Sequence, residues 1–344
     1  MKAIRKLSPQ AGFDWVDVAP PQPGSDEVLV KIAHASVCGT DVHITDWDDW
    51  SASRIKPPLT YGHEFCGHIE AVGPGVDHLA KGDYVSAEMH ITCGICGPCM
   101  SGKPHICSDV QIAGIDRDGC YAEYIVLPKR QIIKLPPSIP LHVASCLDAV
   151  GNAVHSVERG HVSGQSVLIT GCGPIGLFSI AVARALGATR VFATDLSPYR
   201  LELAEKMGAH RVFNPAQEDV LGTLDQLLRG RGIDVVIEMS GAEAALTQGF
   251  EALKPGGRMV LLGLPTKPVQ IDLTRHIILK ETEVVGVHGR RMFDTWLLML
   301  ELLDSGQLNL DPIFTHQLAM SDFGQAIDLM RSGQAGKVVL NPTA

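Results

Sequence analysis

The chain has 344 residues, of which 45% are hydrophobic and 19% charged, a composition typical of globular proteins and unlike that of disordered or fibrous ones. Its 29 basic and 38 acidic residues leave a formal net charge of −9, which argues against nucleic acid or an anionic membrane as a partner. A prior of about 150 residues per domain predicts two domains.

The beginning of the chain carries no targeting signal that we recognise. Residues 1–12 contain three basic residues but no apolar core and no small-residue cleavage site, so we expect no secretory signal peptide. The longest uncharged apolar stretch, 167–183, is interrupted by three glycines and a proline, which favours a strand, a turn and a helix over a membrane span. Together these features predict a cytoplasmic protein.

The first 150 residues contain short segments of β type that are separated by glycine and proline. These segments lie at 27–33, 67–72, 83–86 and 122–127. Such spacing predicts a compact, mostly antiparallel barrel.

From Ser166 onward, predicted strands alternate with predicted helices. The strands are expected at 166–170, 190–195, 211–213, 234–239, 258–263 and 283–287, and the helices at 175–186, 198–207, 219–228 and 243–253. This alternation predicts an α/β fold with a doubly wound parallel sheet and helices on both faces. A last strand, at 337–340, is of the same type as those in the first half of the chain.

A glycine-rich turn joins the first of these strands to its helix. Gly171, Gly173 and Gly176 form a G-x-G-x-x-G pattern, in which the glycines permit a tight turn, the approach of a pyrophosphate and close helix packing. Asp195 ends the next strand, where a carboxylate accepts hydrogen bonds from a ribose and repels a 2′-phosphate, which favours NAD over NADP. Arg200, in the following helix, is expected to stack on adenine or to pair with Asp195.

Four of the nine cysteines lie within fifteen residues, at Cys93, Cys96, Cys99 and Cys107. Because no secretory signal is evident, this crowding favours a metal over disulfides. Four thiolates can hold one tetrahedral Zn²⁺ and leave no position for substrate, so this zinc would be structural. An iron–sulfur cluster uses similar spacing, but the proline that usually follows the last cysteine is missing.

A dispersed third group consists of Cys38, Thr40, His43, His63 and Glu64. A cysteine, a histidine and a carboxylate can hold a catalytic zinc with one position open to substrate. From the residues alone, a cysteine that only fills the core and an ordinary His–Glu pair remain alternatives.

The segment 62–64, Gly-His-Glu, with Gly67, Gly73 and Val76 downstream, resembles the zinc-containing alcohol dehydrogenase signature of the medium-chain dehydrogenase/reductase superfamily. Cys38, the four-cysteine lobe and the glycine turn follow in that family's order, so the resemblance covers essentially the whole chain. It implies a GroES-like catalytic domain at 1–150 with a structural zinc lobe at about 90–110, a Rossmann NAD-binding domain at 151–295, and a return to the catalytic domain at 296–344.

Six segments outside the common scaffold are similar to bacterial L-threonine 3-dehydrogenases, namely 38–44, 46–50, 90–94, 151–155, 289–296 and 330–337. This narrower resemblance implies NAD-dependent oxidation of the 3-hydroxyl of L-threonine to 2-amino-3-ketobutyrate. It also implies a homotetramer and functional coupling to a 2-amino-3-ketobutyrate CoA ligase. The alternatives are another β-hydroxy amino acid, a polyol or a secondary alcohol as substrate, or a non-catalytic NAD-sensing protein.

The resemblance also implies roles for particular residues. Cys38, His63 and Glu64 would bind the catalytic zinc, and Thr40 and His43 would form a proton relay. Further implied contacts to NAD come from Ile175, Leu262, Gly263, Leu264, Val287 and His288.

Two positions near the metal are less sharply defined. Asp148 matches an acidic residue that ligates the zinc or only assists the relay, and the Cys146 thiol is the alternative ligand. His90 occupies a position that the family associates with substrate preference.

Three residues depart from the family pattern, because Met89, Ala149 and Arg291 replace Gly, Pro and Glu. We expect them near the substrate or the metal. Arg291 would favour a carboxylate or larger anionic group on the substrate, unless it points to solvent.

Overall fold

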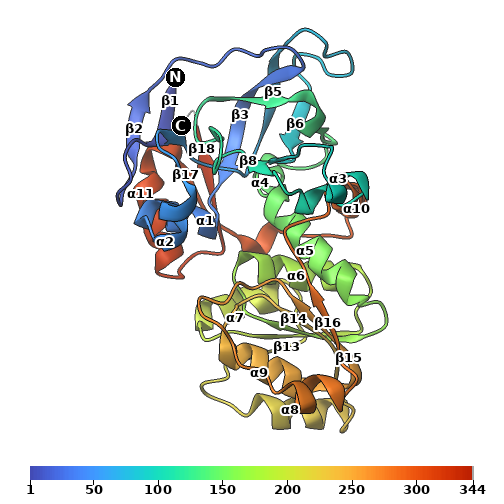
Figure 1. Cartoon of the computed structure of the whole chain (residues 1–344). Helices are drawn as coiled ribbons and strands as arrows, with labels where there is room; N and C mark the ends of the chain where they lie inside the picture. The colour runs from blue at the N-terminus through green and yellow to red at the C-terminus, as the bar shows by residue number, and fades with distance from the viewer. Residues whose placement is uncertain (343–344) are drawn as a thin grey trace. The chain divides into compact units, whose positions relative to one another are not determined.

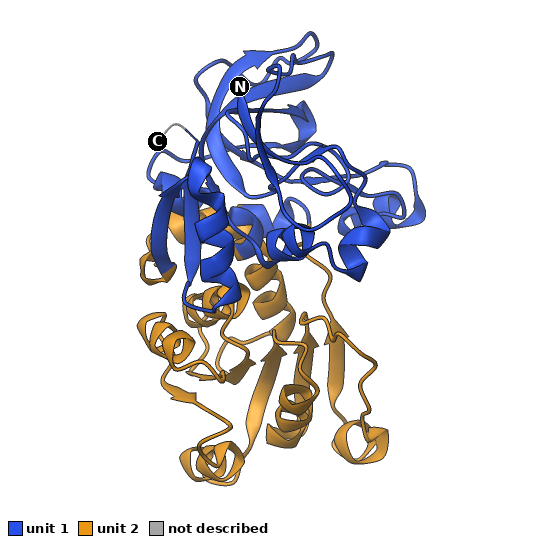
Figure 2. Ribbon diagram, turned by 90° about the vertical axis from the view of Figure 1, so that its left-hand side faces the viewer, with its two compact units in different colours: residues 1–149, 292–296, 314–344 blue, residues 150–291, 297–313 orange. Residues whose placement is uncertain are grey.

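The computed structural model describes residues 1–342 and divides into two compact units, which Figure 2 shows in different colours. Unit 1 comprises Met1–Ala149, Met292–Trp296 and the segment that begins at Phe314, and unit 2 comprises Val150–Arg291 and Leu297–Ile313. The division therefore differs from the domain limits that the sequence predicts, because 292–295 belong to unit 1 and 297–313 to unit 2. Helix α10 (Asp294–Asp304) runs through the boundary without a break, and the turn η4 (Asp311–Ile313) contacts helix α7 (Pro198–Lys206) of unit 2. No glycine or proline lies at the boundary after Trp296, and the signals at Gly306 and Pro312 do not show which unit the segment joins.

Unit 1 is built mainly from antiparallel strands (Figure 1). Its largest sheet has the order β10-β6-β5-β3-β18-β17, with β9 also paired to β3, and two smaller sheets have the orders β2-β1-β4 and β7-β8. The strands are β1 (Lys2–Lys6), β2 (Asp14–Asp17), β3 (Glu27–Ser36), β4 (Leu59–Thr60), β5 (Phe65–Val72), β6 (Tyr84–Ala87), β7 (His90–Ile91), β8 (Gln111–Ile112), β9 (Tyr124–Pro128), β10 (Ile132–Lys134), β17 (Phe314–Ala319) and β18 (Lys337–Asn341). β18 pairs antiparallel with β3, so the end of the chain is part of this unit.

The helices of unit 1 are short and connect the strands. They are α1 (Gly39–Asp46), α2 (Asp49–Arg54), α3 (Gly97–Met100), η1 (Pro104–Ile106), η2 (Lys129–Gln131), α4 (Leu141–Ala144), η5 (Met320–Asp322) and α11 (Phe323–Arg331). Helix α5 (Leu147–Gly160) continues from unit 1 into unit 2.

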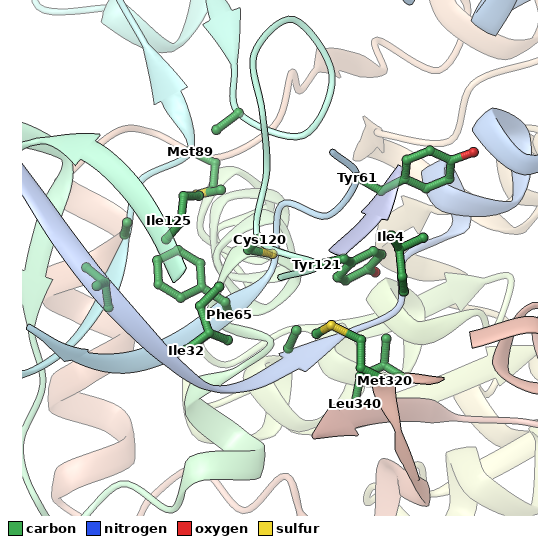
Figure 3. Close-up of a cluster of buried hydrophobic side chains, with 14 of the residues drawn as sticks. Ile4, Ile32, Tyr61, Phe65, Met89, Cys120, Tyr121, Ile125, Met320 and Leu340 are labelled. Carbon is green, nitrogen blue, oxygen red and sulfur yellow. The ribbon is translucent and has the colours of Figure 1, made fainter. Parts of the chain in front are cut away.

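The core of unit 1 gathers apolar side chains from both ends of the chain (Figure 3). Ile32 and Phe65 from the central strands pack in one cluster with Met320 and Leu340. Met89, which the sequence comparison places near the substrate or the metal, is 1% exposed and contributes its side chain to this cluster. Burial of such side chains is the main stabilising contribution to a domain of this size.

Unit 2 contains a six-stranded sheet with the order β13-β12-β11-β14-β15-β16, in which every pair of neighbours is parallel. The strands are β11 (Ser166–Thr170), β12 (Arg190–Thr194), β13 (Arg211–Phe213), β14 (Ile233–Glu238), β15 (Leu253–Leu261) and β16 (Glu283–Gly286), and the helices include α6 (Pro174–Ala185), α7, α8 (Val220–Leu228), α9 (Glu243–Ala252) and a short π-helical turn, η3 (Thr274–Ile278). This arrangement confirms the predicted doubly wound sheet. The strand order reverses between β11 and β14, and ligands of such sheets bind at the carboxyl ends of the strands at this point.

The largest difference in unit 2 from the predicted element boundaries is at the start of β15, and the other boundaries shift by one or two residues. Strand β15 begins at Leu253, whereas the sequence predicts that the preceding helix ends at that residue and that the strand begins at Arg258. Leu253 pairs with Ile233 before a register shift, and regular pairing resumes at Arg258. The intervening Pro-Gly-Gly sequence predicts that no strand passes through it. The strand nevertheless continues, with a shift in its pairing register at this point.

Among residues 1–342, no helix is both long enough and apolar enough to cross a membrane.

Candidate active site and metal centres

Three side chains of unit 1 offer metal ligands to a single point. Donor atoms of Cys38, His63 and Glu64 all lie within 4.8 Å of one another. Cys38 is the N-cap of α1, and the other two residues precede β5 after Gly62, whose φ of +90° and close contact with Tyr121 exclude a side chain. A thiolate, an imidazole and a carboxylate are the donor types that zinc prefers.

The carboxylate of Glu64 is held through one oxygen only. Its Oε2 accepts from Ser36 Oγ and forms an ion pair with Lys337 Nζ, which also donates to the carbonyl of Val37 at 2.9 Å. Glu64 Oε1 is buried and has no hydrogen-bond partner within the described part of the chain. A buried carboxylate oxygen without a partner is costly, and a metal ion at this point would satisfy it. The donor set therefore fits a zinc ion.

His63 lies near a buried carboxylate. Asp41, which is 0% exposed, accepts from the Cys38 backbone N–H at 2.8 Å and from the Tyr121 hydroxyl at 2.6 Å. Its other oxygen lies 4.0 Å from His63 Nδ1. Burial alone would lower the pKa of His63, but the Cys38 thiolate and then the Asp41 carboxylate raise it to about 10. The site therefore stabilises positive charge, as a metal site must.

Asp148 and Cys146 lie outside this group of donor atoms. Asp148, on α5, is 9% exposed, and its charge contributes to the raised pKa of His63. Cys146 Sγ donates to the Val143 carbonyl at 3.2 Å, and burial raises the pKa of its thiol, which disfavours the thiolate that zinc needs.

The residues expected to relay a proton lie on α1. The Thr40 hydroxyl is 3.8 Å from Cys38 Sγ, at the metal group. His43, one helical turn further, has a side chain that is 61% exposed, and its Nδ1 lies 2.6 Å from Asp48 Oδ2. Residues three apart lie on one face of a helix. Thr40 is therefore near the donor atoms of Cys38, and His43 lies on the same face of α1 at the exposed surface.

The four clustered cysteines form a second group. Sγ of Cys107 lies 3.5 Å from Sγ of Cys93 and 3.8 Å from Sγ of Cys96, and Cys99 completes the set. Zinc–sulfur bonds of about 2.3 Å in a tetrahedron place sulfurs about 3.8 Å apart, whereas a disulfide requires about 2.05 Å. Backbone N–H groups of Cys96 and Asp109 also donate to two of these sulfurs, as suits thiolates.

The glycine turn of unit 2 has the geometry that its sequence predicts. Gly171 has φ +91°, a side chain on Gly176 would lie 2.0 Å from the Gly171 carbonyl oxygen, and Gly173 faces open space. The N-terminus of α6 has no side-chain cap, so its N–H groups remain for an anion. Ile175 lies in the first turn of this helix.

The carboxylate of Asp195 is oriented by the backbone on both sides. It accepts from the N–H of Cys172 at 2.7 Å and of Ser197 at 2.8 Å. Arg200 Nε is buried and has no hydrogen-bond partner among residues 1–342. Burial raises the pKa of the Cys172 thiol, and the positive charge of Arg200 opposes this rise. The two side chains expected to bind the adenosine half of a dinucleotide thus lie near the same turn.

The remaining residues expected at the cofactor follow β15 and β16. Leu262 and Gly263 donate their N–H groups to the Glu238 carbonyl, and Leu264 is 87% exposed. Val287 donates to the Leu261 carbonyl, and His288 is the exposed residue that follows.

Sequence reasoning missed four buried polar residues that hold these sites. Asp41 and Lys337 lie within segments quoted only for their resemblance. Glu88 lies just before one, is 0% exposed, and accepts from Trp296 Nε1 and from the His90 backbone N–H, both at 3.0 Å. Glu238 ends β14, is 0% exposed and accepts from Ser240 and Gly241 N–H groups at 2.8 and 3.0 Å. A buried acid at the end of a parallel strand was the available signal for Glu238.

Comparison with known families agrees with this geometry. The family model for zinc-binding dehydrogenases matches residues 174–305, and the model for the alcohol dehydrogenase GroES-like domain matches residues 24–137. The chain therefore belongs to the zinc-binding dehydrogenases of the alcohol dehydrogenase type. Within this class it is similar over its whole length to proteins named L-threonine 3-dehydrogenase, which confirms the narrower resemblance.

Two such relatives illustrate the extent of the similarity. The chain is 48% identical over 340 residues to an L-threonine 3-dehydrogenase from Pyrococcus abyssi, with 98% of each chain covered. It is 47% identical over 343 residues to one from Bacillus velezensis, with 99% of each chain covered.

Solved structures confirm the fold class and a nicotinamide cofactor for the family. A zinc-binding dehydrogenase from Sinorhizobium meliloti 1021 bound to NADP is 29% identical, with a TM-score of 0.90 and 99% of each chain covered. An alcohol dehydrogenase from Escherichia coli CFT073 complexed with NADH is 26% identical, with a TM-score of 0.91 and the same coverage. Since one neighbour holds NADP and the other NADH, the choice between the two is a matter for the residues of this chain.

Proposed function

We propose that the chain catalyses the NAD-dependent oxidation of the 3-hydroxyl of L-threonine to 2-amino-3-ketobutyrate. The observation that carries this proposal is the convergence of Cys38, His63 and Glu64 around one point, where Glu64 Oε1 lacks a partner. Similarity to L-threonine 3-dehydrogenases over 98% of the chain supports the substrate.

In this proposal Cys38, His63 and Glu64 hold a catalytic zinc ion, and Asp148 either joins them or assists the proton relay. When bound, the zinc ion supplies a Lewis acid that lowers the pKa of the substrate hydroxyl. Lys337 keeps Glu64 in place and neutralises part of its charge. A second zinc ion, on Cys93, Cys96, Cys99 and Cys107, has a structural role.

The reaction removes one hydride and one proton from the substrate. When bound, NAD⁺ would supply the acceptor for the hydride, so that the product is a ketone at carbon 3. Thr40 accepts the hydroxyl proton and passes it to His43, whose exposed ring releases it to water. Asp48, as the partner of His43 Nδ1, fixes the orientation of that ring.

The cofactor is proposed to be NAD rather than NADP. Asp195 presents a carboxylate whose position is fixed by two backbone N–H groups, so it accepts from the ribose hydroxyls and repels a 2′-phosphate. Gly171, Gly173 and Gly176 bring the pyrophosphate to the N-terminus of α6.

The cellular setting is part of the same proposal. We expect a cytoplasmic homotetramer whose product is passed to a 2-amino-3-ketobutyrate CoA ligase. Such coupling suits a β-keto acid that otherwise loses CO₂ to give aminoacetone.

The test is NADH formation from NAD⁺ and a panel of alcohols, followed by absorbance. L-threonine is compared with L-serine, L-allo-threonine, 3-hydroxynorvaline and 2-butanol. We expect turnover of L-threonine well above the others. Preference for 3-hydroxynorvaline would move the substrate within the β-hydroxy amino acids, and activity on 2-butanol alone would overturn the proposal.

A further inference from the structure

A buried carboxylate lies where the strand order of the unit 2 sheet reverses. Glu238, which is 0% exposed, ends β14, and Thr170 ends the neighbouring strand β11. A doubly wound sheet binds a dinucleotide across the carboxyl ends of its strands at this point, with one mononucleotide on each half of the sheet. Asp195 follows β12 and is expected at the adenosine, so the nicotinamide half belongs over β14, β15 and β16.

Two glycines place Glu238 beside the turns that we expect at the cofactor. A side chain on Gly263 would lie 2.5 Å from Glu238 Oε2, so the backbone of the turn after β15 packs directly on the carboxylate. A side chain on Gly171, in the turn before α6, would lie 2.8 Å from Cβ of Ser240, whose N–H donates to Glu238. The carboxylate therefore contacts the turn after β15 directly and the proposed pyrophosphate turn through Ser240.

The hydrogen-bond donors to this carboxylate are all neutral. Its Oε1 accepts from the N–H of Ser240 at 2.8 Å and from the hydroxyl of the same residue. Oε1 also accepts from the Gly241 N–H at 3.0 Å and from Thr170 Oγ1 at 3.4 Å, and Oε2 lies 3.1 Å from the Gly241 nitrogen. Backbone N–H groups only donate, so these contacts suit an ionised carboxylate. Since none of these donors is a cation, they stabilise the negative charge without neutralising it.

A negative charge at this place distinguishes the two oxidation states of a nicotinamide. The oxidised ring carries a positive charge that is lost when the ring accepts a hydride, whereas the adenosine and the pyrophosphate are the same in both states. Attraction between opposite charges is stronger inside a protein than in water, because the effective dielectric constant is lower.

We propose that Glu238 is a specificity-determining residue that favours binding of NAD⁺ over NADH. Its charge acts on the nicotinamide half of the cofactor, while Asp195 acts on the adenosine half. This inference rests on the proposed use of NAD and does not depend on which alcohol is the substrate.

The test measures the dissociation constants of NAD⁺ and NADH for the wild-type holoenzyme and for Glu238→Gln, in the absence of alcohol. Binding of NADH is followed by its fluorescence, and binding of NAD⁺ by competition with NADH. The amide oxygen of glutamine can replace Oε1, which receives most of the hydrogen bonds, so the change removes mainly the charge. We expect Kd for NAD⁺ to rise about tenfold and Kd for NADH to change less than about twofold, the size of one charge–charge interaction across several ångströms of protein.

The controls separate the charge from the position of the turns. Glu202→Gln, at an exposed carboxylate of α7 paired with Lys206, should leave both constants unchanged. Zinc content and melting temperature identify a Glu238→Gln protein that fails to fold. In that case the shorter pair Glu238→Asp and Glu238→Asn repeats the comparison, and only the aspartate variant should retain the wild-type ratio of the two constants.

An equal change in the two constants on loss of the charge would show that Glu238 only holds the turns in place. Unchanged constants would show that its charge does not act on the nicotinamide, and either result would overturn the inference. Failure of the wild-type protein to bind NAD⁺ and NADH would instead overturn the proposed use of NAD. Failure to oxidise L-threonine would overturn the proposed substrate and leave this comparison of cofactors valid.

Discussion

At the scale of single residues, the candidate metal site depends on charged side chains that are buried in pairs. Lys337 and Glu64 are 1% and 0% exposed, and each would be costly to bury alone. Burial lowers the pKa of Lys337, but Glu64 and then Cys38 oppose this effect and hold it above its usual value. The ammonium group therefore stays charged and keeps one oxygen of Glu64 occupied. The other oxygen, Glu64 Oε1, has no hydrogen-bond partner among the described residues and remains for a metal ion.

At the same scale, Asp195 is expected to set the choice of cofactor. Asp195→Asn should raise KM for NAD⁺ by about 10- to 100-fold, since hydrogen bonds to charged groups are worth about 1.5–3 kcal/mol. It should also lower KM for NADP⁺, because the repulsion of the 2′-phosphate disappears. Steady-state kinetics with L-threonine and each cofactor checks this, and Asp225→Asn, at an exposed carboxylate of α8, is the control. An unchanged KM for NADP⁺ would show that another residue discriminates.

At the scale of elements, we expect the cysteine lobe to depend on the zinc ion that we propose for it. Ile95 and Met100 are 80% and 79% exposed, so apolar burial contributes little to the lobe. Its chain is ordered by short turns around four sulfurs, so we expect its folding to require the proposed zinc ion.

Cys107→Ser should therefore remove one zinc ion per chain and make the lobe sensitive to proteolysis. Zinc is measured by atomic emission, and cleavage sites by mass spectrometry. Met100→Ser, on the same lobe, should keep both zinc ions. A Cys107→Ser protein with two zinc ions would contradict the structural role.

Strands β11 and β14 are tied by a side chain whose effect on stability depends on pH. Asp234 accepts from the Ser166 N–H and hydroxyl at 2.8 and 2.6 Å and pairs with Lys254. Burial would raise the pKa of the Asp234 carboxyl, but the hydrogen bonds from Lys254 and Ser166 outweigh it and hold the pKa below its ordinary value.

A carboxyl whose pKa is lowered on folding stabilises the protein above its unfolded pKa, and this contribution is lost as the pH falls through the folded pKa. Asp234→Asn should therefore lower the free energy of unfolding by about 1–3 kcal/mol at pH 7. The difference from wild type should shrink below about pH 4. Thermal unfolding from pH 3 to 8 measures it, with Asp225→Asn as control. A difference that is constant with pH would mean that the carboxylate charge is not responsible.

At the scale of the whole molecule, the sequence predicts those motifs and elements whose residues lie close together along the chain. The glycine turn at Gly171, the cysteine lobe and the parallel sheet all follow from patterns within about 30 residues, where backbone geometry decides the outcome. The contacts of Glu88 with Trp296 and of Glu64 with Lys337 join distant parts of the chain. Only the tertiary fold brings such partners together, so the sequence named neither Glu88 nor Lys337 as a site residue.

The same distinction explains the remaining differences. Met89 stood out as a departure from the family pattern, but its position in the core depends on packing with strands remote in sequence. The assignment of 297–313 to unit 2 depends on contacts of η4, which local propensity does not encode.

In the proposed function, zinc held by Cys38, His63 and Glu64 supports the oxidation of L-threonine. The most direct test removes metal from the wild-type protein and from Cys38→Ser, and then follows zinc binding and NADH formation together during a zinc titration. We predict that wild type binds two zinc ions per chain and regains activity with them. Cys38→Ser should retain the zinc of the cysteine lobe and lose at least about 99% of the activity, in line with the several kcal/mol that a Lewis acid contributes. Full activity in the metal-free wild type, or in Cys38→Ser, would show that zinc at these three residues is not required for the reaction.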